Sequence, residues 1–367
     1  MKKLIALICA LALVVGLAAV PAAAESGKPL NIVIITSSGV DDGNFNQDCY
    51  EGIKAFIADH PDCTVTDVKE ADLAKLIPTV EQFAGQYDVF VLPGFNFGGI
   101  GDIVLANPDK YFLVVDSTIQ DSEGQPVTAD NVYTMTYKEQ EGGFMAGVAA
   151  ALTTKTNKVT EINGIAFPSN VNYEYGFIAG VNYANAKYGT AAEFVEIPSF
   201  AGTDMAGQNV GGNYVGDFAK PEIGKSIAEA LIGEGCDVIF AAAGLSGNGA
   251  LTAVKEAEGV WFIGCDVDQY DDGAKGDGNV ILTSSLKVMH LDVQRQLEAI
   301  YNGTFAGQDA LLGADTDSTG YVSAEGRQQL SEDALAKLAE CYELMKKGEI
   351  VPPSGTEYSV TDFPGLK

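Results

Sequence analysis

Short runs of apolar residues alternate with segments of helical periodicity over the first third of the chain. Residues 31–36, 88–93 and 111–116 are apolar almost throughout, and residues 49–58 carry apolar side chains at helical spacing. Strands that are apolar on both faces and separated by helices are typical of a parallel sheet that helices cover on both sides. This part of the chain therefore predicts a doubly wound α/β lobe.

The same alternation begins again after a strand that we expect at residues 131–136. The later strands are expected at 162–167, 194–197, 237–242, 260–265 and 280–284, and the helices at 139–152, 173–188, 220–232, 250–257, 286–301 and 332–347. A second series with the same order of elements predicts a second α/β lobe.

Two lobes of this kind leave a cleft between them. We expect lobe 1 to comprise residues 28–136 with about 268–300, and lobe 2 to comprise residues 137–267 with about 301–367. Open α/β sheets bind ligands beyond the carboxyl ends of their strands. Residues that directly follow a strand are therefore the first candidates for the binding chemistry.

The N-terminal segment has the three regions of a secretory signal. Lys2 and Lys3 precede an apolar run that continues to Val20, and Ala22 and Ala24 occupy the small-residue positions of a cleavage site. We therefore expect residues 1–24 to be a signal peptide and the mature protein to be exported, to the periplasm or the extracellular space. The mature chain has no apolar run of the roughly 18 residues that crossing a bilayer requires.

Composition and charge restrict the class of partner. The 367 residues are 47% hydrophobic and 20% charged, which is the composition of a globular chain and not of a disordered one. There are 50 acidic against 22 basic residues, and the formal net charge is −28. Such a charge repels nucleic acid and weighs against adsorption to anionic lipid. We therefore expect no nucleic-acid partner and attribute the acidic surface to the solubility of an exported protein.

Cysteine and histidine give no sign of a metal centre or a catalytic triad. Five cysteines remain after the expected cleavage, and none lies in a Cys-x-x-Cys pair. A bridge between Cys49 and Cys63 stays open as an alternative, and the other cysteines fit small buried residues. The only histidines, His60 and His290, lack the partner residues of a zinc site or of a serine triad.

Two clusters of acidic residues are candidates for a metal site or a catalytic site. Residues 266–272 contain four aspartates, which would suit a secreted hydrolase that uses carboxylates, and this stays as an alternative function. Residues 315–320 resemble the first half of a calcium loop, but the twelfth position, where a glutamate is needed, is Gly326. We therefore expect neither a metal nor a cofactor.

Six segments, in this order, closely resemble the basic membrane protein (Bmp) family, the purine-nucleoside substrate-binding proteins of ABC transporters. They are Gly39–Gln47, Tyr137–Gly147, Tyr214–Phe218 followed by Gly224 and Lys225, Ala243–Gly249, Gly264–Gln269 and Leu282–Lys287. Because the segments are spread over most of the mature chain, their combined signal is far more specific than any one of them.

The resemblance implies a type I periplasmic-binding-protein fold, with two lobes that are each a doubly wound parallel sheet and a ligand cleft between them. It further implies a non-enzymatic, monomeric, extracytoplasmic solute-binding protein of an ABC importer. Its partners would be a purine nucleoside of the inosine, guanosine or adenosine type and a permease in the membrane. The same fold with a sugar or a signalling molecule as ligand stays as a further alternative.

Two phenylalanines are candidates for stacking on the purine base that the resemblance implies. Phe45 stands at the start of the first helix, within the polar run Asp-Asp-Gly-Asn-Phe-Asn, where a merely structural phenylalanine is unexpected. Phe218 stands just after a strand of the second lobe. Stacking of a base on an aromatic ring contributes about 1–3 kcal/mol, so we expect Phe45 and Phe218 to hold the base between them.

Three charged residues are candidates for polar recognition. Asp116 and Asp266 each end an apolar strand, so their carboxylates should face the cleft, where they can accept hydrogen bonds from a ribose diol or from the purine edge. Lys287 can orient one carboxylate or donate to the base. An ion pair between the lobes is the alternative role of these three residues. Weaker candidates for contacts at the rim are Asn46, Tyr173 and Gly244.

Overall fold

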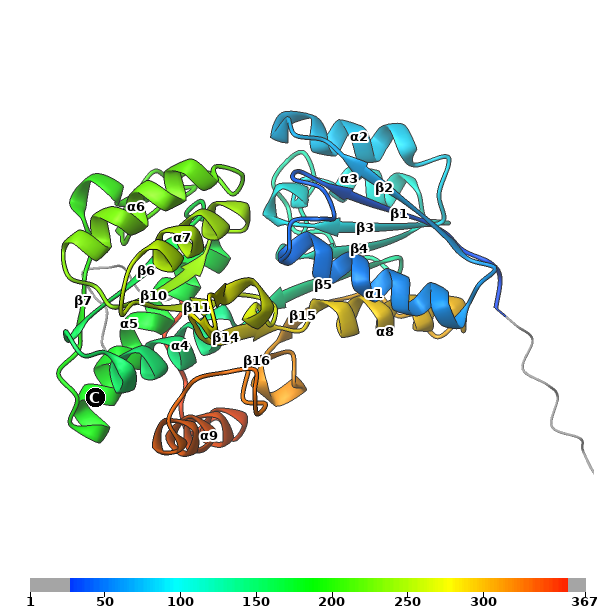
Figure 1. Cartoon of the computed structure of the whole chain (residues 1–367). Helices are drawn as coiled ribbons and strands as arrows, with labels where there is room; N and C mark the ends of the chain where they lie inside the picture. The colour runs from blue at the N-terminus through cyan, green and yellow to red at the C-terminus, as the bar shows by residue number, and fades with distance from the viewer. Residues whose placement is uncertain (1–26, 356–367) are drawn as a thin grey trace, which may run out of the picture.

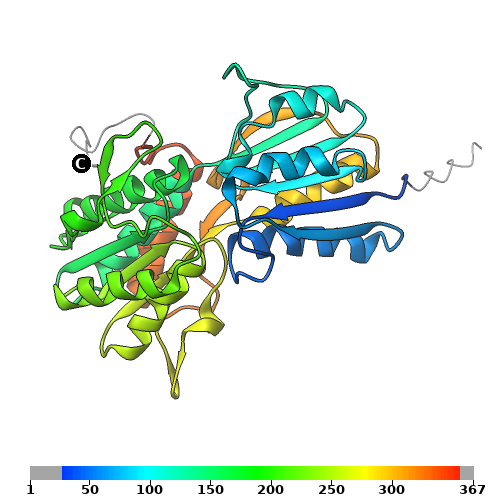
Figure 2. The same cartoon turned by 90° about the horizontal axis from the view of Figure 1, so that it is seen from above.

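The computed structural model describes residues 27–355, so the expected signal peptide 1–24 lies outside the described residues. The chain forms two α/β lobes that lie side by side in both views (Figures 1 and 2). None of the helices in the described part of the chain combines the length and the apolar character that crossing a membrane requires. The expected fold class, two lobes that are each built on a largely parallel sheet, is confirmed.

The sheet of the first lobe has the strand order β15-β5-β4-β3-β1-β2, and every pairing in it is parallel. Its strands are β1 (Asn31–Thr36), β2 (Thr64–Lys69), β3 (Val89–Pro93), β4 (Tyr111–Val115), β5 (Val132–Tyr137) and β15 (Gln308–Leu312). Helices α1 (Phe45–Asp59) and α8 (Met289–Tyr301) cover one face, and α2 (Leu76–Phe83) and α3 (Gly101–Ala106) cover the other (Figure 1). Alternate residues of β1 enter the two cores, which explains its continuous apolar sequence.

The sheet of the second lobe has the order β16-β14-β11-β10-β6-β7, parallel except for β16, which runs antiparallel to β14. Its strands are β6 (Lys158–Asn163), β7 (Glu193–Phe194), β10 (Val238–Ala242), β11 (Trp261–Gly264), β14 (Ile281–Lys287) and β16 (Thr319–Tyr321). Three helices pack on one face, namely α4 (Glu139–Thr153), α5 (Pro168–Tyr188) and α9 (Glu332–Lys346). The other face carries α6 (Pro221–Gly233) and α7 (Leu245–Glu256). Two short hairpins, β8 (Gly202–Thr203) with β9 (Asn209–Gly211) and β12 (Ala274–Lys275) with β13 (Gly278–Asn279), complete the strands.

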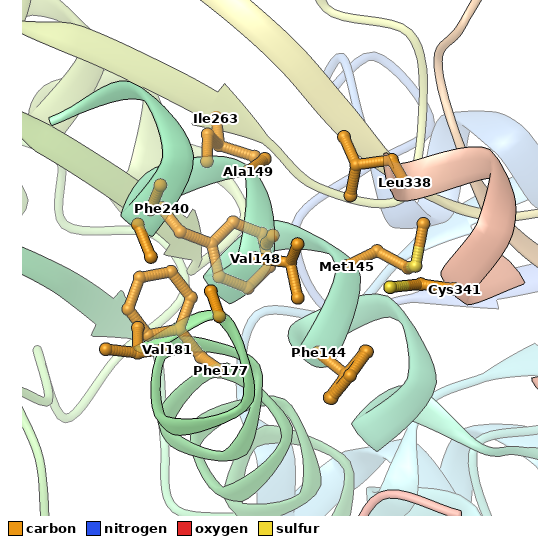
Figure 3. Packing of buried hydrophobic residues seen from close by; sticks show 14 of the residues in the cluster. Phe144, Met145, Val148, Ala149, Phe177, Val181, Phe240, Ile263, Leu338 and Cys341 are labelled. Carbon is orange, nitrogen blue, oxygen red and sulfur yellow. The ribbon is translucent and has the colours of Figure 1, made fainter. Parts of the chain in front are cut away.

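Helices α4 and α5 pack unusually closely, and this contact fixes the position of α5 beside the cleft. A Cβ atom added at Gly147 would lie 2.1 Å from the carbonyl oxygen of Phe177, and one added at Gly180 would lie 2.2 Å from the carbonyl oxygen of Phe144. Only glycine permits so short a distance between two helix backbones. Figure 3 shows the core beside this contact, where Phe177 lies next to Phe240 of β10 at a ring-centroid distance of 6.0 Å.

The chain passes between the lobes after β5, after β14 and after β15. The expected membership of two segments is therefore wrong: β14 pairs with β11 in the second sheet, although 268–300 was expected in lobe 1, and β15 pairs with β5 in the first sheet, although 301–367 was expected in lobe 2. Helix α8, between them, packs against α1 of the first lobe. The apolar pattern predicts β14 but not the distant strand with which it pairs, and it predicts no strand at the place of β15.

Several elements begin earlier than their apolar pattern indicates. The strand expected at 162–167 lies at 158–163, and the helices expected from residues 49, 173 and 250 begin at Phe45, Pro168 and Leu245. The first turns of these three helices are rich in polar or small residues, so they do not continue the periodicity of the core-facing turns. The edge strands β2 and β15 are largely exposed, and for that reason they lack the apolar run that marks a central strand.

All five cysteines in the described part of the chain are buried and unbridged. The alternative of a bridge between Cys49 and Cys63 is therefore wrong. Cys49 packs in the core of the first lobe, where its Sγ lies 4.0 Å from Sδ of Met289, and the Cys63 sulfur accepts a hydrogen bond from the backbone N–H of Leu30. They act as small apolar residues, as expected for the other three.

Candidate ligand-binding site

A pocket lies between the lobes at the carboxyl ends of the two sheets. Its space amounts to about 750 Å³ when the open mouth is included. The first lobe contributes Ser37, Ser38, Asp42, Phe45, Asn46, Pro93, Gly94, Phe95, Asn96 and Asp116. The second lobe contributes Phe167, Ser169, Asn170, Tyr173, Phe218, Ala242, Gly244, Leu245, Cys265, Asp266 and Lys287. The structure thus brings all eight residues expected from the sequence into one pocket.

Asp116 and Asp266 have the same backbone conformation at related places in the two lobes. Asp116 directly follows β4 and has φ 63°, and Asp266 is the second residue after the end of β11 and has φ 68°. This left-handed conformation costs a residue with a side chain about 1–2 kcal/mol, and aspartate is one of the few types that adopt it. Strain of this kind gathers at functional sites. In both lobes it turns a carboxylate at a strand end toward the pocket.

Lys287, the last residue of β14, crosses the cleft and forms an ion pair with Asp116. Its Nζ donates to Oδ1 of Asp116 at 2.9 Å and to Oδ2 at 2.8 Å, and it also donates to Oε1 of Glu139 at 3.2 Å. The Lys287 side chain is only 2% exposed. The inter-lobe ion pair that the sequence left as an alternative is therefore present for Asp116 and Lys287.

The charges in this network are unbalanced. Burial by itself lowers the pKa of Lys287, but Asp116, Glu139 and Asp266 together raise it well above its ordinary value, so the ammonium stays charged. Burial raises the pKa of Glu139 and of Asp266, and Lys287 opposes both shifts. One cation thus serves three carboxylates, and such a site favours a ligand that donates hydrogen bonds over an anionic ligand.

Among residues 27–355, no cation is in direct contact with Asp266. Its Oδ1 accepts a hydrogen bond from the Tyr173 hydroxyl at 3.1 Å, and the Cys265 thiol lies 3.5 Å from the same oxygen. In the described part of the chain, its Oδ2 has no hydrogen-bond partner. Tyr173 therefore orients Asp266 with one carboxylate oxygen available toward the pocket.

Aromatic rings from both lobes line the pocket. Phe95 lies 5.1 Å from Phe167 across the cleft, and Phe167 lies 5.9 Å from Phe218, each distance joining ring centroids. The ring of Phe45 faces the Lys287 ammonium, with 5.3 Å between Nζ and the ring centroid. Phe45 and Phe218 are both half-buried, so each keeps ring surface for a ligand.

Local structure fixes the positions of two of the three weaker candidates, Asn46 and Gly244. The Asn46 amide donates to Ser38 Oγ at 2.7 Å and to Asp42 Oδ2 at 2.8 Å. The Asp42 carboxylate also accepts from the backbone N–H groups at the start of α1, so it caps that helix. Gly244 has φ 54° and directly precedes α7, and an added Cβ would lie 3.3 Å from the carbonyl oxygen of Phe218. A side chain there would be strained and would push against the loop that carries Phe218.

Besides the eight expected residues, three others supply rings or charge at or beside the pocket. Phe95 follows β3, so the rule that ligands bind beyond strand ends was enough to find it. Phe167 was expected inside a strand, and the actual strand ends four residues earlier, at Asn163. Glu139 lies within a segment that resembles the Bmp family, but nothing in the sequence shows that it meets Lys287.

The two acidic clusters do not form a site. Within the run 266–272, Asp268 and Asp271 pair with Arg327 at 2.8 Å each, and only Asp266 lines the pocket. In the possible calcium loop, Asp315 pairs with Lys138. Over residues 27–355, no three or more His, Cys, Asp or Glu side chains are arranged to hold a metal ion.

Known proteins resemble this chain over nearly its whole length. It matches the Bmp family, described as PnrA-like substrate-binding proteins of ABC transporters, over residues 30–198 and 207–353. It is 32% identical to the CD4+ T-cell-stimulating antigen of Listeria monocytogenes over 90% of this chain and 89% of that protein. It is 30% identical to the ABC transporter nucleoside-binding protein BmpA of Lactococcus lactis over 84% of this chain and 87% of that protein.

Solved structures agree on the fold. A solute-binding protein of an ABC transporter system from Aeropyrum pernix superposes with a TM-score of 0.74, at 22% identity, over 89% of this chain and 94% of that one. A second one, from Conexibacter woesei, superposes with a TM-score of 0.63 at the same identity, over 89% of this chain and 99% of that one. Members of the matched family are extracytoplasmic substrate-binding components, not enzymes. The chain therefore belongs to the Bmp family of ABC transporter substrate-binding proteins.

Proposed function

We propose that this protein binds a purine nucleoside, of the inosine, guanosine or adenosine type, between its lobes and delivers it to an ABC permease. One observation carries the proposal: aromatic rings of both lobes and a surplus of carboxylates line the same pocket. A nucleoside needs both, because its base is flat and apolar on its faces whereas its ribose and base edge carry hydrogen-bond donors. The name of the Lactococcus lactis relative supports a nucleoside as ligand.

Each group has a role in this proposal. Phe45 and Phe218 stack on the base, and Asp266 accepts from donors on the ligand. Asp116 accepts from the ribose hydroxyls, since each of its oxygens has a second lone pair besides the one that Lys287 uses. Lys287 holds Asp116 in place. Asn46, Tyr173 and Gly244 complete the rim of the site.

A sugar is the second candidate, because some structural neighbours with this fold bind sugars. A carbohydrate-transporter solute-binding protein from Agrobacterium radiobacter, solved with D-arabinose, superposes with a TM-score of 0.54 at 17% identity, over 84% of this chain and 98% of that one. At this identity the likeness concerns the fold alone. The rings at the pocket of this chain, Phe45, Phe95, Phe167 and Phe218, favour the larger flat surface of a purine.

Native mass spectrometry of the purified protein tests the proposal. A co-purified mass equal to that of a purine nucleoside, displaced by added inosine, supports it. A co-purified sugar that inosine does not displace would contradict it. Incubation with inosine, guanosine and adenosine should give stoichiometric binding with no free base released, whereas turnover would point to the hydrolase alternative.

A further inference from the structure

The Lys287 ammonium has a second carboxylate partner on the side away from the ligand pocket. Glu139 lines a neighbouring cavity, between the segments that connect the lobes, but it does not line the ligand pocket. Asp116 lines both cavities, and Lys287 lines only the ligand pocket. The Lys287 side chain thus lies between the ligand pocket and Glu139.

Glu139 is held rigidly in this position. It is the first residue of α4, just after the chain has crossed from the first lobe, and it is 3% exposed. Its Oε1 accepts from Lys287, while its Oε2 accepts from the side-chain amide of Asn172 on α5 at 3.1 Å. With one oxygen fixed by each neighbour, the carboxylate cannot turn without losing a buried hydrogen bond.

The two partners of Lys287 belong to different lobes. Asp116 is part of the first lobe, whereas Glu139 and Lys287 both belong to the second. In the described chain, the Lys287 ammonium donates hydrogen bonds to these two carboxylates only. If the lobes separate to admit a ligand, Asp116 must move away from Lys287 with its lobe, whereas Glu139 belongs to the same lobe as Lys287.

We propose that Glu139 is a positioning residue for ligand recognition: it holds the Lys287 ammonium in place in the open protein, so that Asp116 and the ligand meet a preformed cation on closure. A lysine side chain free in the open cleft would adopt many rotamers, and ordering it on each closure would weaken binding. A buried ammonium that lost Asp116 and had no other partner would also be costly. The choice of inosine as the probe below rests on the proposed function.

The central variant is Glu139→Gln, which keeps the size of the side chain and removes its charge. Glu141→Gln is the matched control, because Glu141 is also buried in the first turn of α4 but accepts from the Ala314 N–H and the Thr319 hydroxyl at 2.7 Å each, and not from Lys287. Glu139→Asp is the second variant, since it keeps the charge and only shortens the side chain. It keeps the test decisive if Glu139→Gln does not fold.

The first measurement needs no ligand. The ¹⁵N signal of the Lys287 ammonium, assigned by its loss in Lys287→Met, should be sharp in the native protein and in Glu141→Gln. It should be broadened or shifted in Glu139→Gln and in Glu139→Asp. An unchanged Lys287 signal in both Glu139 variants would overturn the inference.

The second measurement is the affinity for inosine by calorimetry. The affinity of Glu139→Gln for inosine should be at least about tenfold lower than that of the native protein. Glu141→Gln should bind inosine with the native affinity. In a Lys287→Met background, Glu139→Gln should weaken binding no further, because the residue acts through Lys287. Additive losses in the double variant would overturn the inference. If the native protein binds no nucleoside, the proposed function fails, and the ammonium signal alone decides the role of Glu139.

Discussion

The carboxyl ends of the two sheets carry an aspartate in the same left-handed conformation, yet the two aspartates have different neighbours. Asp116 of the first lobe forms two hydrogen bonds with the Lys287 ammonium of the second. Asp266 of the second lobe is held by the neutral Tyr173 hydroxyl and touches no cation of the described chain. The same backbone geometry thus presents to one pocket a carboxylate in a direct ion pair and a carboxylate held by a neutral hydroxyl.

This difference gives the two aspartates different roles, one in linking the lobes and the other in contacting the ligand. Because the partner of Asp116 lies in the opposite lobe, the ion pair links the two lobes, and any movement that separated them would break it. Burial raises the pKa of Asp266, and the Lys287 ammonium, which forms no ion pair with it, offsets this shift only in part. Donors on a ligand would offset the remaining cost of burial, so Asp266 is the carboxylate whose contribution depends most on the ligand.

The largest effect should come from removing the shared cation. Lys287→Met leaves Asp116, Glu139 and Asp266 buried without compensation, so we expect a loss of about 3–5 kcal/mol of stability and a loss of nucleoside affinity larger than in any variant below. Urea unfolding and calorimetry measure the two effects. Lys138→Met is the control, because the ion pair of Lys138 with Asp315 is partly exposed and should contribute less than about 1 kcal/mol. Equal losses in both variants would contradict the account.

Removing each aspartate charge sharpens the comparison. Asp266→Asn should lower nucleoside affinity by about 1.5–3 kcal/mol while leaving stability unchanged or higher. Asp116→Asn should lower affinity and stability together, because it leaves Lys287 with one partner fewer. The native protein should also bind 2′,3′-dideoxy nucleosides weakly, and Asp116→Ala should lose most of this discrimination. If Asp116→Asn and Asp266→Asn change affinity and stability in the same way, the two aspartates do not have different roles.

The aromatic residues extend the comparison to the base. Phe45→Ala in the first lobe and Phe218→Ala in the second should each lower affinity by about 1–3 kcal/mol, as loss of base stacking does, and the variants should remain folded. Calorimetry gives the affinities and circular dichroism checks the fold. Unchanged affinity in both variants would show that these rings only fill space.

A carboxylate away from the pocket gives the smallest expected effect. Glu174 on α5 is fully buried and accepts from the Tyr214 hydroxyl at 2.6 Å, and burial raises its pKa from an ordinary value near 4.5 to about 8. The folded state therefore holds a proton that the unfolded state has released, and stability should fall as the pH rises from about 4.5 to about 8.

Glu174→Gln should remove part of this loss and stabilise the protein by about 1–2 kcal/mol at pH 8.5. Urea unfolding at pH 6 and 8.5 measures the change. The same substitution at the exposed Glu193 should leave the pH dependence as it is. A native protein equally stable at both pH values would show that Glu174 does not titrate in this window.

Much of the fold follows from the apolar pattern, because central parallel strands are buried on both faces. The strand at 31–36 lies where the sequence predicts it, and the site residues Asp116 and Asp266 follow directly from the rule about strand ends. The edge strands β2 and β15 carry too few buried residues to be marked in this way. The lobe to which β14 belongs depends on its pairing with a strand far away in the sequence. The local apolar pattern carries no information about such a pairing.

The sequence predicts which residues line the pocket better than it predicts which of them contact each other. All eight expected residues line the pocket. The ion pair of Lys287 with Asp116, rather than with Asp266, depends on how the two lobes are placed relative to each other. The place of Glu139 behind Lys287 depends on how α4 enters the second lobe. Such choices are set by ångström differences between elements that are far apart in the chain.

Calorimetric titration of the native protein with inosine, beside D-ribose and inosine 5′-monophosphate, tests the central claim most directly. The account predicts one saturable inosine site per chain and no binding of ribose, which lacks the base. It predicts binding of the monophosphate at least about tenfold weaker than that of inosine, because the pocket has a surplus of carboxylates. Binding of ribose without binding of inosine, or a preference for the monophosphate, would contradict it.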